Sequence, residues 1–150
     1  MDEIEIYTDG ACRGNPGPGG WAAVVRGHGY ENILQGAEAE TTNNRMELTA
    51  AVQALDTLKQ RFRITLYTDS EYVQKGISEW LPAWKARGWK TASKKPVKNQ
   101  DLWQQLDTAA SRHAVNWQWV RGHAGNRGNE QVDRLANAAI DKMLGVRSEE

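Results

Sequence analysis

Two short segments of this 150-residue chain follow one pattern, and no other feature constrains the fold as strongly. Residues 4–10 and 64–70 each run an apolar, β-branched alternation into Thr-Asp and a small residue. The pattern is typical of a strand that ends on a carboxylate. Residues 44–62 between them have a helical period, and a helical crossover makes the strands that it joins parallel. We therefore expect Asp9 and Asp69 to be neighbours in space.

Two neighbouring carboxylates indicate a cation. Unit charges about 4 Å apart repel by about 4 kcal/mol at an effective dielectric constant of about 20. A fold that gathers such charges normally does so around a metal ion. The first hypothesis for this pair is therefore a divalent-metal site.

The remaining patterns predict one α/β domain over residues 1–150, with a five-stranded mixed sheet and flanking helices. Residues 10–20 are rich in glycine and proline, which predicts a tight connection. After Asp69 the pattern is helical through Trp84, and Pro82 indicates two short helices that meet there. The other expected elements are strands at residues 21–25, 32–36 and 115–120, a helix that begins at residue 99 or 101, a loop at residues 122–128, and a final helix that carries residues 132–143.

Composition narrows the setting. Cys12 is the only cysteine, which excludes an internal disulfide and favours a reducing, cytoplasmic compartment. The acidic N-terminus lacks the features of a signal peptide, and no apolar run approaches the length of a membrane span. We expect no membrane association, no obligate protein partner and a monomer.

Two further acids belong to the hypothesis, and each has a structural alternative. Glu47 falls in the expected first turn of the helix after residue 43, where spacing alone favours a capping box with Asn44. Asp133 lies at the edge of the buried stripe of the last helix, where an ordinary solvated charge remains an open alternative. Taken together, the four acids come from positions that an α/β sheet brings to one edge.

Oxygen-only ligands favour a hard cation, Mg²⁺ with Mn²⁺ as a substitute, over zinc. Pairs of such ions carry out phosphoryl chemistry. His123 lies between glycines in the loop before Asp133. This setting favours a proton-transfer role, and an incidental loop residue is the alternative.

Charge is unevenly distributed in a chain whose formal net charge is zero. Residues 75–98, which we call the handle, hold seven Lys or Arg residues and one acid, Glu79. Trp80, Trp84 and Trp89 are interleaved with these cations. The pattern is typical of a surface that binds a phosphate backbone. The alternative is a solvated face whose tryptophans pack against the core.

Four sequence blocks occur in a set order: residues 7–10 with 14–20, residues 41–48, residues 68–70, and residues 120–125 followed by Asn129, Glu130 and Asp133. In this order they resemble the type 1 ribonucleases H of bacteria (bacterial ribonuclease HI), which cut the RNA strand of RNA/DNA hybrids. The resemblance covers nearly the whole chain, and the handle resembles the family's substrate-binding segment. It implies a ribonuclease H-like fold.

The resemblance also implies roles for individual residues. Asp9, Glu47, Asp69 and Asp133 would hold two Mg²⁺ ions, and His123 would assist product release or shuttle a proton. Hydrolysis would leave 5′-phosphate and 3′-hydroxyl ends. The expected substrate-binding residues are Asn15, Thr42, Asn43, Asn44, Trp80, Trp84, Lys85, Arg87, Trp89, Lys90 and Glu130.

Two rival interpretations come from other classes of protein. A hybrid-binding module without activity need not keep all four acids. A related two-metal nuclease, such as an integrase or a junction resolvase, would share the acids but neither the handle nor the Asn-Asn-Arg block at residues 43–45.

Overall fold

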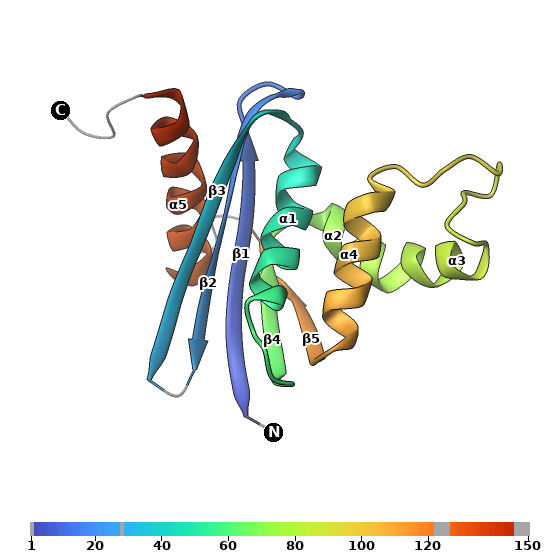
Figure 1. Cartoon of the computed structure of the whole chain (residues 1–150), viewed down its shortest axis with the longest axis horizontal. Helices are drawn as coiled ribbons and strands as arrows, with labels where there is room; N and C mark the ends of the chain where they lie inside the picture. Colours follow the sequence, from blue (N-terminus) through green and yellow to red (C-terminus); the bar gives the residue numbers. More distant parts are fainter. Residues whose placement is uncertain (1, 28, 122–126, 146–150) are drawn as a thin grey trace.

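The computed structural model of the chain describes residues 2–27, 29–121 and 127–145. Within these residues five strands form one mixed sheet in the order β3-β2-β1-β4-β5 (Figure 1). Strands β1 to β3 form an antiparallel meander, and β4 and β5 run parallel to β1. The predicted five-stranded mixed sheet is confirmed. The strands are β1 (Glu3–Cys12), β2 (Gly17–Gly27), β3 (Tyr30–Thr41), β4 (Arg63–Thr68) and β5 (Ala114–Trp119).

The parallel pairing of β1 and β4 places the two Thr-Asp segments side by side. Tyr7 lies opposite Tyr67 in the register, and α1 (Asn43–Asp56) forms the crossover between the strands. Both strands run toward the same edge of the sheet. Asp9 in β1 and Asp69 directly after β4 are therefore brought together, as the sequence predicts.

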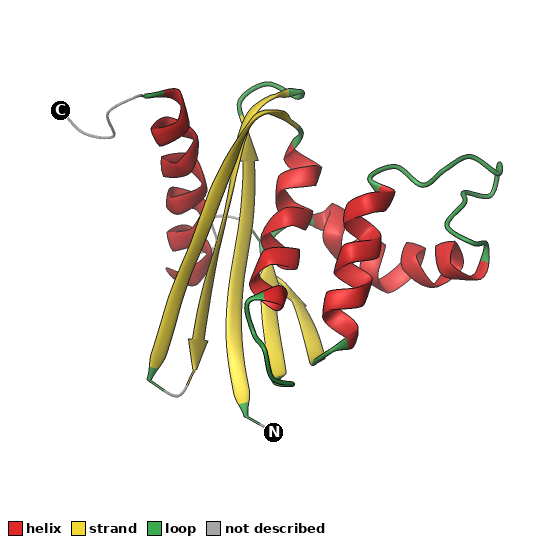
Figure 2. Cartoon of the chain, viewed as in Figure 1, coloured by secondary structure: helices red, strands yellow, loops and turns green. Residues whose placement is uncertain are grey.

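Helices cover both faces of the sheet (Figure 2). Helix α5 (Arg127–Leu144) packs on one face against β1, β2 and β3, and α1 packs on the other, with α4 (Gln100–Ser111) beside it. The handle contains the π-helical η1 (Gly76–Trp80) and α3 (Leu81–Ala86), follows α2 (Glu71–Lys75), and extends away from the sheet (Figure 1). None of the described helices is long and apolar enough to cross a membrane.

Two apolar cores hold these layers together. The larger lies between the sheet and α1 and α4, where Ile6, Leu55 and Trp103 are fully buried. The smaller lies under α5 and includes Val24 and Val132. Burial of each large apolar side chain stabilises the fold by about 1.5–3 kcal/mol. Both cores lie beside the strand ends that carry the acids, so these ends stand on rigid elements.

The glycine-rich segment predicted as a connection is mostly strand, and this prediction is wrong. β1 continues to Cys12, β2 begins at Gly17, and Gly19 pairs with Cys12. A Cβ atom on Gly19 would lie 2.5 Å from Cγ2 of Thr41 and 2.9 Å from the carbonyl oxygen of Ala11. Glycine at this position therefore permits close packing within the sheet, a role that composition does not distinguish from turn formation.

Two helix predictions also need correction. Helix α1 ends at Asp56, so Leu58 and Phe62 pack on the large core from the connection that follows it. The helical run after Asp69 divides into three helices, α2, η1 and α3, rather than two. The junction predicted from Pro82 is present between Trp80 and Leu81, and Pro82 lies in the first turn of α3. Proline is tolerated there because the first turn of a helix needs no donor from its backbone.

Candidate active site

Three carboxylates meet at the edge of the sheet. Asp9, Glu47 and Asp69 each offer one oxygen, and these oxygens all lie within 4.8 Å of one another. Gly10 makes the approach of α1 possible, because a Cβ atom there would lie 2.5 Å from the backbone nitrogen of Glu47. The structure thus brings together three of the four acids that the sequence singles out, from β1, α1 and the end of β4.

The capping alternative for Glu47 is wrong. Helix α1 begins at Asn43, and its N-cap is Thr42, whose hydroxyl accepts a hydrogen bond of 3.2 Å from the Arg45 N–H. Glu47 therefore lies in the second turn, beyond the reach of a capping box. Its side chain is buried, and its Oε1 atom has no hydrogen-bond partner within the described residues.

Asp133 completes the group from the opposite side of the sheet. It lies on α5, lines the same cleft as the other three acids, and forms a side-chain hydrogen bond with Asp9. The side chain is half-buried. The alternative of an ordinary solvated helix charge is therefore wrong.

The electrostatics of the cluster favour protonation. Burial, followed by the neighbouring charge of Asp69, raises the pKa of Asp9 to about 8. Burial also raises the pKa of Glu47 well above its ordinary value, with further contributions from Asp9 and Asp69. The pKa of Asp69 is raised mainly by burial, and hydrogen bonds oppose this effect. A bound cation would reverse this preference, because it stabilises the ionised carboxylates.

The acids line an open cleft of about 630 Å³. The sequence alone assigned no role to several residues in and around it, among them Trp119 and Asn129. Trp119 is the last residue of β5, and Asn129 lies one helical turn before Asp133 on α5. Their places at a strand end and on the helix of a predicted ligand were signals that could have found them. The other lining residues outside the predicted site are Gly10, Ala11, Cys12, Ser70, Glu71 and Tyr72.

The predicted contacts at the start of α1 lie on the rim of this cleft. Asn43 and Asn44 line it directly. Asn15 accepts a hydrogen bond of 3.0 Å from the backbone N–H of Asn43, so it supports the first turn of α1. The hydroxyl of Thr42 serves as the helix cap.

The handle places its tryptophans in an aromatic cluster. Trp84 lies 5.8 Å from Trp80 and 5.4 Å from the fully buried Trp103, measured between ring centroids. Trp84 and Trp89 pack against the large core, so the core-packing interpretation holds for these two rings. None of the three tryptophans lines the acidic cleft.

The predicted cations of the handle differ in their surroundings. Lys85 forms an ion pair with Asp107 of α4 at 3.2 Å. Arg87 and Lys90 are exposed and form no ion pair with the described carboxylates. Glu130 is exposed on the first turn of α5, and His123 lies outside the described residues.

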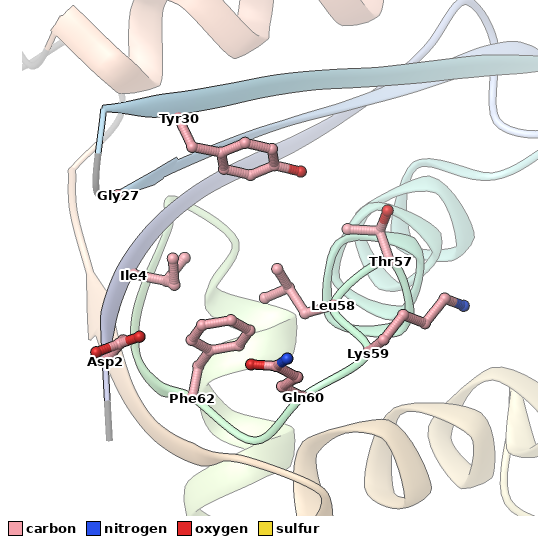
Figure 3. Close-up of a pocket in the computed structure, with 9 residues that line it drawn as sticks. All are labelled: Asp2, Ile4, Gly27, Tyr30, Thr57, Leu58, Lys59, Gln60 and Phe62. Carbon is pink, nitrogen blue, oxygen red and sulfur yellow. The ribbon is translucent and has the colours of Figure 1, made fainter.

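A second hollow lies toward the start of β1, around Ile4, Tyr30, Leu58 and Phe62 (Figure 3). Its volume is about 420 Å³. Among the residues that the structure describes, Asp2 is the only acid that lines it, and none of the predicted site residues does so. The cluster that can hold a metal is therefore confined to the other cleft among the described residues.

Comparison with solved structures identifies related folds. LC9-RNase H1, a type 1 RNase H with the type 2 active-site motif, is 35% identical, with 95% of this chain and 74% of that one covered and a TM-score of 0.85. LC11-RNase H1, solved in complex with RNA/DNA hybrid, is 25% identical, with coverages of 94% and 99% and a TM-score of 0.73. The fold is therefore ribonuclease H-like.

Sequence comparison agrees with the fold. The family model for RNase H matches residues 1–141. A ribonuclease H of Pseudomonas syringae pv. syringae and a ribonuclease HI of Pseudomonas syringae pv. tomato are each 60% identical over 146 residues, which are 97% of either chain in both comparisons. Because sequence identity is this high over almost the whole length, it supports a hydrolytic nuclease activity as well as the fold. The chain belongs to the ribonuclease H family.

Proposed function

We propose that this protein is a metal-dependent endoribonuclease that hydrolyses the RNA strand of RNA/DNA hybrids. The observation that carries the proposal is the cluster of Asp9, Glu47 and Asp69, with three carboxylate oxygens within 4.8 Å. Such a cluster destabilises a fold unless a cation balances it. The relatives named ribonuclease H and the hybrid bound to LC11-RNase H1 support the choice of substrate.

The donor set fits hard divalent cations. All the candidate ligands are carboxylate oxygens, and the buried Oε1 atom of Glu47 has no hydrogen-bond partner within the described residues. Asp9, Glu47, Asp69 and Asp133 would hold two Mg²⁺ ions, or Mn²⁺ as a substitute. When bound, the pair supplies activation of the attacking water and neutralisation of charge on the leaving oxygen.

The products follow from this ligand set. Hydrolysis by water needs no ribose nucleophile, so the products would carry 5′-phosphate and 3′-hydroxyl ends. Cleavage through the 2′-oxygen would instead require a paired acid and base and would give a cyclic phosphate. In this proposal the 2′-hydroxyl is recognised but does not attack.

Several residues on the rim of the cleft and elsewhere in the chain would contact the substrate. Asn43 and Asn44 on its rim, with Asn15 and Thr42 behind them, would contact the minor groove and the backbone of the hybrid. Shape and 2′-hydroxyl recognition are how proteins read RNA-containing duplexes. Glu130 would contact the RNA strand, and His123 would assist product release or shuttle a proton.

The handle would supply affinity for the polyanion. Its cations include Arg87 and Lys90, which are exposed and form no ion pair with the described carboxylates. Neutralisation of phosphates by such residues gives salt-dependent binding. Lys85 would contribute less because Asp107 already pairs with it. Trp84 and Trp89, which pack against the large core, would fix the shape of this surface, and Trp80 would contact the sugar-phosphate backbone of the hybrid.

The proposal also covers domain organisation, cellular compartment and oligomeric state. Residues 1–150 would form one catalytic domain that acts as a cytoplasmic monomer without an obligate protein partner. The single cysteine and the match of the family model to residues 1–141 support this view.

A substrate panel tests the proposed function. An RNA/DNA hybrid, duplex DNA, duplex RNA and both single strands, each labelled on one strand, are incubated with the protein in Mg²⁺ and in chelator. We expect internal cuts only in the RNA strand of the hybrid, and only with metal. Binding of the hybrid without cleavage would identify an inactive binding module, and cleavage of DNA would identify another class of two-metal nuclease. Either result would overturn the proposal.

A further inference from the structure

Asp69 is the least restrained of the three clustered carboxylates. Asp9 lies within the ladder of β1 opposite Ala22, and Glu47 lies within α1. Both of these acids are at most 5% exposed. Asp69 follows the end of β4, belongs to no helix or strand, and is half-buried. Its carboxylate accepts hydrogen bonds from its own backbone and from the side chain of Asp9, and residues of other elements restrain it further.

Asn129 restrains the carboxylate of Asp69 from α5. Its side chain is 4% exposed and donates a hydrogen bond to the Asp69 carboxylate. The residue lies on the first turn of α5, one turn before Asp133. A buried amide in this position can hold the carboxylate in one orientation without adding charge to the cluster.

Trp119 restrains the backbone of the same residue from β5. Its indole Nε1–H donates a hydrogen bond of 3.3 Å to the carbonyl oxygen of Asp69. The ring lines the acidic cleft and is 37% exposed, one of five large apolar side chains exposed within the described residues. Trp117, two residues earlier on the same strand, packs against the large core instead. Core packing therefore does not explain the position of Trp119.

We propose that Asn129 and Trp119 are positioning residues that hold Asp69, from its carboxylate and its main-chain carbonyl respectively, in the orientation that binds a divalent cation. This inference rests on the metal site in the proposed function. Substitution of a residue that orients a metal ligand typically lowers the affinity for the metal by about 10- to 100-fold. The expected consequence is a change in metal affinity rather than in the chemical step.

The test compares Mn²⁺ binding by calorimetry in four forms of the full chain: wild type, Asn129→Ala, Trp119→Phe and the matched control Trp117→Phe. We expect affinity about tenfold weaker for Asn129→Ala and a smaller loss for Trp119→Phe. Trp117→Phe makes the same chemical change on the same strand but faces the core, so it should bind Mn²⁺ as the wild type does.

A kinetic arm separates positioning from a general structural role. For the two positioning variants, the Mn²⁺ concentration that gives half-maximal cleavage should rise, while kcat at saturating Mn²⁺ stays close to wild type. Lower melting temperatures with unchanged Mn²⁺ affinity would overturn the inference. If Asn129→Ala does not fold, Trp119→Phe decides alone, since its ring is exposed. Absence of Mn²⁺ binding by the wild type would instead contradict the proposed function.

Discussion

Asp9 is expected to destabilise the metal-free fold by like-charge repulsion and also to be required for the proposed activity. It is buried, it contacts three other acids, and its pKa is raised to about 8. We expect Asp9→Asn to stabilise the metal-free protein by about 1 kcal/mol or more at pH 8, because it removes like-charge repulsion, while it abolishes turnover. Denaturant unfolding in chelator measures the first effect. Destabilisation of the metal-free protein would show instead that the cluster is a structural network.

His123 is expected to assist the reaction without being indispensable. Its Ala variant should lose about 10- to 100-fold in kcat and remain folded, because the proposed cations already activate the attacking water. Single-turnover and steady-state rates, with circular dichroism as the folding control, measure this. Wild-type turnover would refute the proton-transfer role, and complete loss would make His123 an essential group.

The residues of the site show what the sequence predicts and what it leaves open. The neighbourhood of Asp9 and Asp69 followed from the parallel strands, because register fixes such positions. Glu47 could not be separated from a cap, since the alternative depended on where α1 begins, and only the hydrogen bond between Thr42 and Arg45 decides that. Trp119 carries no motif of its own, and its contact with Asp69 depends on tertiary geometry.

At the scale of elements, the handle is expected to supply affinity rather than chemistry. Replacing Lys85, Arg87 and Lys90 with Ala should raise KM, leave kcat nearly unchanged and flatten the salt dependence by roughly one unit of slope per lost phosphate contact. The double variant Arg87→Ala/Lys90→Ala should produce most of this change, because Lys85 is paired with Asp107. Cleavage rates over a range of salt concentrations measure it. An unaltered KM and slope would leave only a solvated face.

Element boundaries were predicted less well than element types. Hydrophobic periodicity identified each strand of the sheet, but it extended α1 past Asp56, because Leu58 continues the apolar stripe from outside the helix. Glycine and proline content predicted a tight connection over residues 10–20, whereas Gly19 lies in β2, where it allows close packing. Such roles depend on partners distant in sequence, which local patterns do not contain.

For the whole molecule, we expect the stabilisation that bound metal provides to depend on pH. Because the folded-state pKa of Asp9 is raised above its unfolded value, its contribution to stability is present below about pH 4 and is lost as pH rises toward 8. The pKa values of Glu47 and Asp69 are raised as well, so they act with the same sign. We therefore expect Mg²⁺ to raise the melting temperature more at pH 8 than at pH 5.

His113 acts with the opposite sign and has to be separated from this effect. Burial lowers its pKa, so its contribution to stability is lost as pH falls below about 6.5. Comparing melting temperatures with and without Mg²⁺ at each pH cancels this contribution, because His113 is not part of the acidic cluster. It follows α4, and its ring forms a hydrogen bond with the carbonyl oxygen of Leu55 near the end of α1. An equal Mg²⁺ effect at pH 5 and pH 8 would contradict the carboxylate site.

Mass spectrometry can test directly whether the carboxylate cluster directs metal-dependent attack by water on the RNA strand of a hybrid. The digestion products are made in ¹⁸O-labelled water with Mg²⁺. We expect RNA fragments with 3′-hydroxyl ends and 5′-phosphates that carry one ¹⁸O atom, and no fragments from Asp9→Asn. Cyclic-phosphate ends, equal cleavage of the DNA strand, or the same products from Asp9→Asn would contradict it.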